Sequence, residues 1–135
     1  MLEFVNMEYT LEWNIPSHVL LLHVSGDVSV EDLGKFNHDM NHYLDEGISC
    51  VHLVSIGDNI RRVPTNLMQI KENLSYLQHP KMGWTIIVQE KPNPLTGFIV
   101  SVAAQATGMK MHQAKNLEES LTVLNRLDSS LCNNT

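Results

Sequence analysis

Apolar and polar residues alternate along the first part of the chain with the two-residue period of a β-strand. Residues 8–13 alternate strictly, and residues 18–24 form an almost continuous apolar run. The first pattern is typical of a strand with one face in solvent, and the second of a strand buried on both faces. Residues 14–17 between them read Asn-Ile-Pro-Ser, which favours a tight turn. We therefore expect the chain to open with a β-hairpin.

From residue 29 onward the apolar positions recur at helical spacing, interrupted by short apolar runs that are typical of buried strands. Ser29 and Asp32 have the spacing of a helix-capping box, and Gly47 follows the last apolar position of that helix. Gly108 is placed to end a later helix, and Asn116 to begin the last one. The expected elements after the hairpin are helix 29–46, strand 50–54, helix 65–78, strand 84–88, helix 95–107, strand 109–112 and helix 116–127.

The resulting order, β-β-α-β-α-β-α-β-α, predicts the α/β fold class. Strands that alternate with helices imply right-handed crossovers and a mainly parallel sheet, to which the opening hairpin adds an antiparallel strand. We expect a mixed, mainly parallel sheet with four helices, formed by a single domain over residues 1–127. Residues 128–135 are polar and terminal, and we expect them to form a frayed tail.

Composition and charge narrow the classes of function. The chain has 135 residues, with 9 Lys and Arg against 15 Asp and Glu, which gives a net charge of −6. This acidic balance, without clustered basic residues, argues against a nucleic-acid partner. No apolar run reaches the roughly 20 residues of a membrane span, and the opening Met-Leu-Glu-Phe lacks the basic region of a signal peptide. Cys50 and Cys132 are too few for a disulfide framework, so we expect a cytoplasmic protein.

The segment 57–66 is the strongest candidate for a binding site. It follows the strand at 50–54, and in open α/β sheets ligands gather beyond the carboxyl ends of the strands. Asp58, Arg61, Arg62 and Thr65 lie in this segment, just before the start of the next helix. The arginines and the positive end of that helix together favour an anion, a phosphate group or an acidic partner. The alternative is a solvated loop in which Thr65 only caps the helix.

The other chemically suggestive motifs point to no catalytic or metal site. His38 and His42 have the i, i+4 spacing with which a helix binds zinc, but they fall opposite the apolar face and should point into solvent. A weak surface metal site is the remaining alternative there. The sequence contains no Gly-x-Ser-x-Gly elbow and no glycine-rich phosphate loop. We therefore expect no catalytic residues, no metal and no cofactor.

The helix expected at 95–107 has two faces of different character. Its core face is predicted to consist of Phe98, Ile99, Val102 and Ala106. A second stripe contains only small residues, namely Gly97, Ser101, Ala104 and Gly108. Small side chains let another backbone approach closely, so the stripe is a candidate homodimer interface. Close packing on a neighbouring helix of the same chain is the alternative.

The order of elements, including the opening hairpin, resembles that of STAS domains, the SpoIIAA-like fold of anti-sigma-factor antagonists. Residues 111–121, Met-His-Gln-Ala-Lys-Asn-Leu-Glu-Glu-Ser-Leu, are similar to that family's last strand followed by "sLeeAL". In STAS regulators the strand equivalent to 50–55 leads into an Asp-Ser-Ser-Gly-like stretch, whose serine takes the phosphate that switches partner binding. Here the stretch 57–64 has no serine, and Thr65 alone offers a hydroxyl near the helix start.

Three classes of function follow from these observations. The resemblance implies a non-enzymatic regulatory or protein-interaction domain, which would bind its partner through segment 57–66 and helix 65–78. The first alternative is a protein that binds a small anionic or lipid-like ligand near Arg61 and Arg62, as the related Sec14-like fold does. The second alternative is an enzyme that combines Asp58 and Arg62 with a distant histidine.

Overall fold

The computed structural model describes residues 7–131 except 48–49, 90 and 92, and it leaves out the side chains of 58, 59, 106 and 128–131. The elements follow the predicted order, with a 3-10 helix added after the second helix. The strands are β1 (Glu8–Ile15), β2 (Val19–Asp27), β3 (Val51–Arg62), β4 (Met82–Val88) and β5 (Met111–Ala114). The helices are α1 (Val30–Glu46), α2 (Leu67–Glu72), the 3-10 helix η1 (Ser75–Gln78), α3 (Pro94–Thr107) and α4 (Leu117–Leu131).

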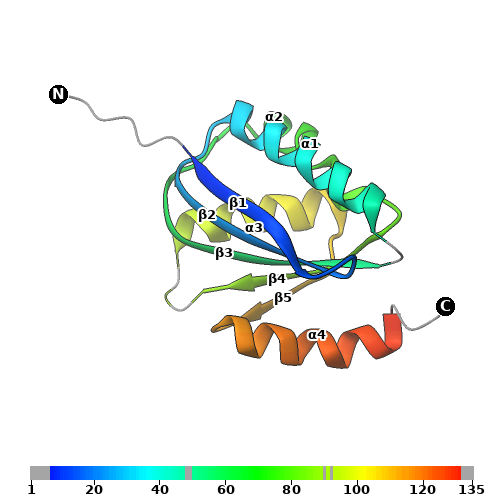
Figure 1. The fold of residues 1–135 in the computed structure, drawn as a ribbon. Helices are drawn as coiled ribbons and strands as arrows, with labels where there is room; N and C mark the ends of the chain where they lie inside the picture. The colour runs from blue at the N-terminus through cyan, green and yellow to red at the C-terminus, as the bar shows by residue number, and fades with distance from the viewer. Residues whose placement is uncertain (1–6, 48–49, 90, 92, 132–135) are drawn as a thin grey trace.

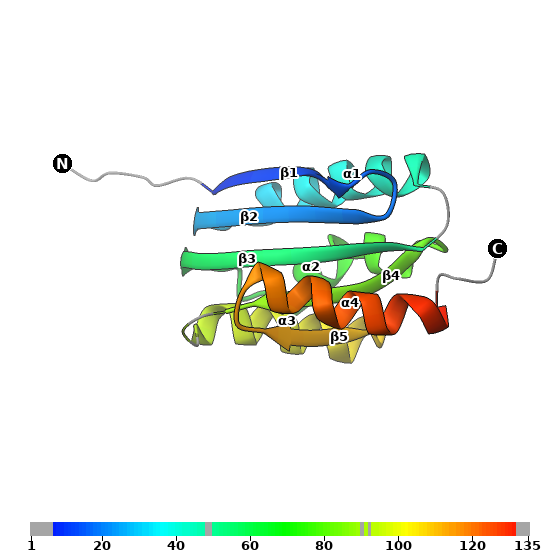
Figure 2. The same ribbon diagram turned by 60° about the horizontal axis from the view of Figure 1, so that its bottom comes forward.

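The five strands lie in the sheet in the same order as in the chain. β1 is antiparallel to β2, and β2, β3, β4 and β5 are parallel to one another. The α/β class, the mixed and mainly parallel sheet and the four α-helices are therefore confirmed. Because successive right-handed crossovers in one direction place their helices on the same side, α1, α2 and α3 cover one face of the sheet. Figures 1 and 2 show α4 alone on the other face.

Each face of the sheet has its own apolar core. The larger core lies under α1, α2, η1 and α3 and includes Leu20, Leu22 and Leu53 from the sheet. The smaller core lies under α4 and includes Leu21, Val54 and Ile86. Neighbouring residues of one strand thus contribute to opposite cores, as the alternation of side chains along a strand requires.

The antiparallel edge strand β1 is fastened to α1 by aromatic side chains. Tyr9 and Phe36 meet edge to face with ring centroids 5.8 Å apart, and Trp13 and Tyr43 do so at 5.6 Å. The hydroxyl of Tyr43 also donates a 3.0 Å hydrogen bond to the carbonyl oxygen of Leu11. As an edge strand, β1 has a neighbouring strand on one side only. These contacts attach it to α1 as well.

The third strand is longer than the sequence indicates, which corrects the expected loop at 57–64. β3 continues to Arg62 because the end of β2 provides a partner for it. Ser25 lies opposite Asn59, Gly26 opposite Ile60, and Asp27 opposite Arg62. Backbone pairing with β2 therefore overrides the weak strand propensity of Gly-Asp-Asn at 57–59. The non-strand connection to α2 is reduced to residues 63–66.

The second helix is shorter than the expected 65–78. α2 ends after Glu72. The side-chain amide of Asn73, the next residue, donates a 2.8 Å hydrogen bond to the carbonyl oxygen of Gln69. The following 3-10 turn is held by α1, where Asn37 donates to the hydroxyl of Ser75 at 2.9 Å and accepts from the backbone N–H of Tyr76 at 2.9 Å. A side chain from another helix thus divides the expected helix into two short ones.

The predicted helix ends are confirmed where their capping residues were identified. Ser29 and Asp32 form both hydrogen bonds of a capping box, and Gly108 ends α3 in the left-handed conformation with φ of 65°. Asn116 accepts a 2.8 Å hydrogen bond from the backbone N–H of Glu119. α4 extends to Leu131, so the tail expected at 128–135 begins with four helical residues, and 132–135 lie outside the described residues. Within the described part of the chain, no helix is long and apolar enough to cross a membrane.

Candidate functional site

The candidate binding segment lies at the carboxyl end of the parallel sheet, as predicted. β2 to β5 run in the same direction, so the ends of all four strands meet at one edge. Arg61 and Arg62 are the last two residues of β3, and Thr65 follows in the connection to α2. Asp58 belongs to β3, but its side chain lies outside the described part of the structure.

A shallow surface hollow brings three of the predicted residues together. Arg61, Arg62 and Thr65 line it along with Val63, and α3 contributes Leu95 and Phe98 from its first turns. Both arginines and Thr65 are exposed to solvent. The hollow therefore combines two guanidinium groups and a hydroxyl with an apolar wall.

Large apolar side chains are exposed in this hollow and at the start of α2, the helix that follows Thr65 in the chain. Leu67 is 57% exposed, Met68 72% and Phe98 37%, and these are three of the four large hydrophobic residues exposed in the described structure. We call the group formed by Arg61, Arg62, Thr65, Leu67, Met68 and Phe98 the arginine surface. The sequence did not indicate its apolar part, because Phe98 is in the predicted core face of the helix at 95–107.

The exposure of Phe98 corrects the predicted core face of α3. The buried residues of this helix are Thr96 and Ala103, with Ile99 and Val102 packed partly against the larger core. α3 contains no charged residue between Pro94 and Thr107, and apolar side chains occur around its whole circumference. Hydrophobic periodicity therefore could not decide which face is buried. The side chain of Ala106, also predicted to be buried, lies outside the described residues.

Acidic residues border the other side of Arg62. A second hollow is lined by Arg62 and Thr65 together with Asp27 from the end of β2 and Glu31 and Asp32 from the first turn of α1. These carboxylates offset the charge of Arg62. The positive charge is consequently concentrated on the side of Arg61, next to Leu95 and Phe98.

Thr65 does not cap α2, so the alternative interpretation, in which it serves only as a helix cap, is wrong. The cap of α2 is Asn66, whose side chain accepts a 3.1 Å hydrogen bond from the backbone N–H of Gln69. α2 has only six residues, so its macrodipole is small and one of its free N–H groups is already satisfied. The helix start thus adds little to anion binding, and attraction of an anion depends on the two arginines.

The stripe of small residues on α3 faces outward. Gly97, Ser101 and Gly108 are exposed and Ala104 is half-buried. No heavy atom lies within 4 Å of where a side-chain carbon on Gly97 or Gly108 would be. At Gly97 and Gly108, therefore, the stripe makes no close contact with a neighbouring helix of the chain, the alternative to a dimer interface.

The two histidines of α1 point into solvent, as predicted. His38 and His42 are exposed, and His42 lies 3.2 Å from a carboxylate oxygen of Glu46 one turn later. Among the described residues no group of three or more His, Cys, Asp or Glu side chains is placed to hold a metal ion. None of the described residues that line the two hollows is a histidine.

Comparison with known proteins gives no independent assignment of a family or a function. No protein-family model matches the chain, and no curated protein matches it in sequence. A functional hypothesis therefore depends on the resemblance in element order and on the arginine surface.

Proposed function

We propose that this chain is a cytoplasmic, non-enzymatic regulatory domain of the STAS type, which binds a protein partner through the arginine surface. Two observations support the STAS assignment. The sheet has an antiparallel first strand followed by parallel strands in sequential order, and the last strand leads into a capped, leucine-rich helix. Both features are those on which the resemblance to that family depends.

The observation that carries the proposal is the exposure of apolar side chains next to two arginines. Exposed apolar groups surrounded by polar ones are typical of interaction sites. Arginine, methionine and aromatic residues are also enriched at protein interfaces. Met68 and Phe98 would provide the apolar contact, and Arg61 would pair with a carboxylate of the partner. We therefore expect a partner that presents acidic side chains around an apolar one.

Thr65 offers a means of regulating this contact. Its hydroxyl is exposed and lies in the same hollow as Arg61 and Arg62. A phosphate on Thr65 would add nearly two negative charges beside the guanidinium groups and would repel an acidic partner. Thr65 would then take the part of the phosphorylated serine in STAS regulators, although it comes later in the chain.

A small anionic ligand is the second candidate for this surface. The hollow has arginines on one side and Leu95 and Phe98 on the other, so it could hold an acidic head group and an apolar portion at once. The exposure of Leu67 and Met68 outside the hollow favours the protein partner, because a small ligand would leave these side chains uncovered.

The test is native mass spectrometry of the protein purified gently from its own host. We expect the wild type to carry a second protein, and the Arg61→Ala/Arg62→Ala variant to lose at least about tenfold in affinity for it, which corresponds to 1.4 kcal/mol. Lys110→Ala/Lys115→Ala is the matched control, because it removes the same charge from exposed positions near β5. A partner retained by the arginine variant would contradict the proposal, and a small bound mass lost with the arginines would favour the anionic ligand.

A further inference from the structure

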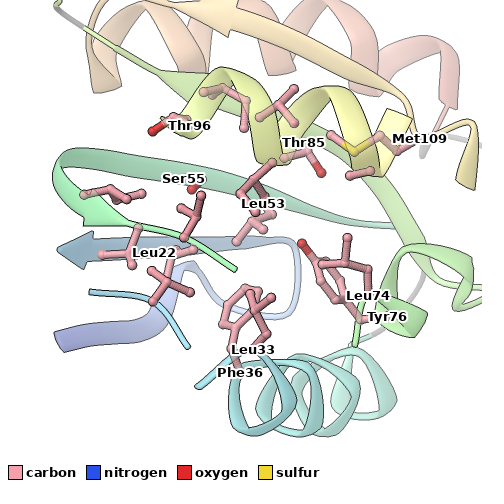
Figure 3. A pocket seen from close by; sticks show the side chains of 18 of the residues that line it. Leu22, Leu33, Phe36, Leu53, Ser55, Leu74, Tyr76, Thr85, Thr96 and Met109 are labelled. Atoms are coloured by element: carbon pink, nitrogen blue, oxygen red, sulfur yellow. The ribbon is translucent and has the colours of Figure 1, made fainter. Parts of the chain in front are cut away.

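A cavity of about 110 Å³ lies inside the larger core, between the sheet and the helices that cover it. Its walls come from β2, β3 and β4 on one side and from α1, η1 and α3 on the other, as Figure 3 shows. The cavity is distinct from the arginine surface, because Arg61, Arg62, Thr65 and Phe98 do not line it.

Most of the cavity wall is apolar, and none of the described side chains that line it is charged. The apolar part includes Leu22, Leu33, Phe36, Leu53, Leu74 and Met109. A charged molecule would lose its hydration in such a space without gaining an ion pair, so the cavity excludes carboxylates and ammonium ions. Whatever occupies it is electrically neutral.

Two residues that line this space have buried hydroxyl groups without a hydrogen-bond partner. Thr85 is 3% exposed and Thr96 9%, and the Oγ1 atom of each is inaccessible and unpaired among the described residues. Both side chains line the cavity. Buried polar groups nearly always have a hydrogen-bond partner. Two unpaired hydroxyls at one cavity therefore indicate that a hydrogen-bonding molecule occupies it.

Elsewhere in the chain, two buried or partly buried hydroxyls donate a hydrogen bond to a nearby backbone carbonyl oxygen, but those of Thr85 and Thr96 do not. Thr107 and Ser120 each donate to the carbonyl oxygen four residues earlier in their helix, at 2.6 and 2.8 Å. Thr96 is in the first turn of α3, where the fourth preceding residue lies ahead of the helix. Thr85 is in β4, a strand paired on both sides. A valine would fill either position with the same shape and without an unpaired group.

Two further hydroxyl-bearing residues complete the polar part of the wall. Ser55 lies on β3, diagonally across from Thr85, because Leu53 is the direct partner of Thr85 and Ser55 that of Ile87. Tyr76 comes from η1, and Figure 3 shows its hydroxyl pointing into the cavity. Hydroxyl-bearing residues from four different elements of the fold (β3, β4, η1 and α3) thus line an otherwise apolar space.

We propose that this cavity is a binding site for a small, neutral, mainly apolar organic molecule with one hydrogen-bonding group, which Thr85 and Thr96 recognise. An engineered apolar cavity of about 150 Å³ binds benzene, so a volume of about 110 Å³ suits a molecule of about five non-hydrogen atoms. A lipid chain is far too large for it. Val63 lines both the cavity and the hollow of the arginine surface, so its side chain is common to the two.

The test uses two five-membered rings of nearly equal shape, pyrrole with an N–H donor and thiophene without one. Binding is followed by methyl NMR of the full chain, with Leu22, Leu53 and Ile99 as cavity reporters and Val123 in the opposite core as a control. We expect saturable shifts of the cavity methyl groups with pyrrole, at a roughly millimolar dissociation constant, as five atoms allow. Thiophene should bind about fivefold more weakly, the effect of one neutral hydrogen bond.

The hydroxyls are tested with the variant Thr85→Val/Thr96→Val. It should reduce pyrrole affinity about fivefold and leave thiophene affinity within about twofold, since the shape of the cavity is kept. Thr122→Val, which removes a hydroxyl on α4 far from the cavity, should change neither affinity. Equal binding of the two probes to the wild type, or pyrrole binding unaffected by the double variant, would overturn the proposal. Absence of any cavity shift, with only bound water detected at Thr85 and Thr96, would overturn it as well.

Discussion

The backbone N–H of Trp84 donates a 2.9 Å hydrogen bond to Nδ1 of His52 across the neighbouring strands β3 and β4. Because Nδ1 accepts this bond, the ring proton of a neutral His52 is on Nε2. His52 is only 2% exposed, and its ring lies directly over Gly83. The imidazole thus fills the space that a side chain at position 83 would otherwise need.

Gly83→Ala is expected to destabilise the protein by about 2 kcal/mol, the usual cost of overpacking a core. A methyl group at Gly83 would lie 2.6 Å from Nδ1 and 2.7 Å from Cε1 of His52, and 3.3 Å from the carbonyl oxygen of Val51. The ring is buried and cannot move aside freely. Urea unfolding of the variant and the wild type measures the difference.

Gly97→Ala is the matched control for this substitution. Nothing lies within 4 Å of a methyl group at Gly97, which is exposed within α3. Alanine is about 1 kcal/mol more favourable than glycine inside a helix, so this variant should be more stable than the wild type. If Gly83→Ala were also stabilising, the close approach of His52 to Gly83 would be contradicted.

Stability should fall as the pH rises above about 10. Burial raises the pKa of Tyr76 above its ordinary value of 10.0, and burial together with the hydrogen bond to Asp39 raises that of Tyr9. The unfolded chain then releases protons at lower pH than the folded chain, so each raised pKa contributes stability that is present below pH 10 and lost above it. The slope approaches about −1.4 kcal/mol per pH unit for the buried Tyr76, and it is smaller for Tyr9, whose ring is partly exposed to solvent.

Urea unfolding at several pH values between about 9 and 11 measures this slope, since this range brackets the ordinary tyrosine pKa of about 10. Tyr9→Phe and Tyr76→Phe should each make the decline shallower, because each removes one group with a raised pKa. If the slope of stability against pH were the same in the variant Tyr9→Phe/Tyr76→Phe as in the wild type, other groups would account for the alkaline loss of stability.

Thr65→Glu is expected to weaken the complex with the protein partner about fivefold, because the added carboxylate competes for Arg61 and Arg62. Thr65→Val is the control that removes the hydroxyl without adding charge, and it should bind normally. Thr65 is exposed, so both variants should unfold within about 0.5 kcal/mol of the wild type. Isothermal calorimetry with the isolated partner gives the affinities, and equal effects of the two variants would exclude a charge-based switch.

Ala104→Glu should convert a homodimer that uses the small-residue stripe of α3 into a monomer. A carboxylate buried in that interface without a counter-charge would cost more than the contact provides. Gln105→Glu adds the same charge at the adjacent exposed position and should leave the dimer intact. Light scattering after size-exclusion chromatography measures the mass, and an oligomeric state unaffected by Ala104→Glu would rule this interface out.

The order of elements could be predicted because it depends on local signals. Ser29, Gly108 and Asn116 form backbone hydrogen bonds within a few residues, or adopt a conformation that favours glycine, so their roles are visible in the sequence. The difference between alternating and continuous apolar strands likewise reflects the number of buried faces of each strand. Together these signals were sufficient for the fold class.

The length of β3 and the break after α2 could not be predicted because distant residues determine them. Residues 57–62 remain extended only because Ser25 to Asp27 lie beside them in the sheet. The helix beginning at Leu67 is interrupted because the side chain of Asn37, 39 residues before Tyr76, accepts a hydrogen bond from the backbone N–H of Tyr76. Periodicity within one segment carries no information about such partners.

The candidate site was predicted in part. Arg61, Arg62 and Thr65 were identified because their charge and hydroxyl are conspicuous near a strand end, whereas Phe98 was assigned to a buried face. The interior cavity left no trace in the sequence. Its hydroxyls at Thr85 and Thr96 come from a strand and a helix, and only the packed fold brings them to one space.

Val63 gives the two binding spaces a common wall, since it lines the cavity and both surface hollows. A molecule in the cavity that pushes this side chain outward changes the surface that contacts the partner. A partner that presses the side chain inward reduces the volume of the cavity. Thermodynamic reciprocity then requires each occupant to alter the affinity of the other by the same factor. One valine directly after β3 would thus couple binding in the interior of the domain to binding on its surface without any change of fold.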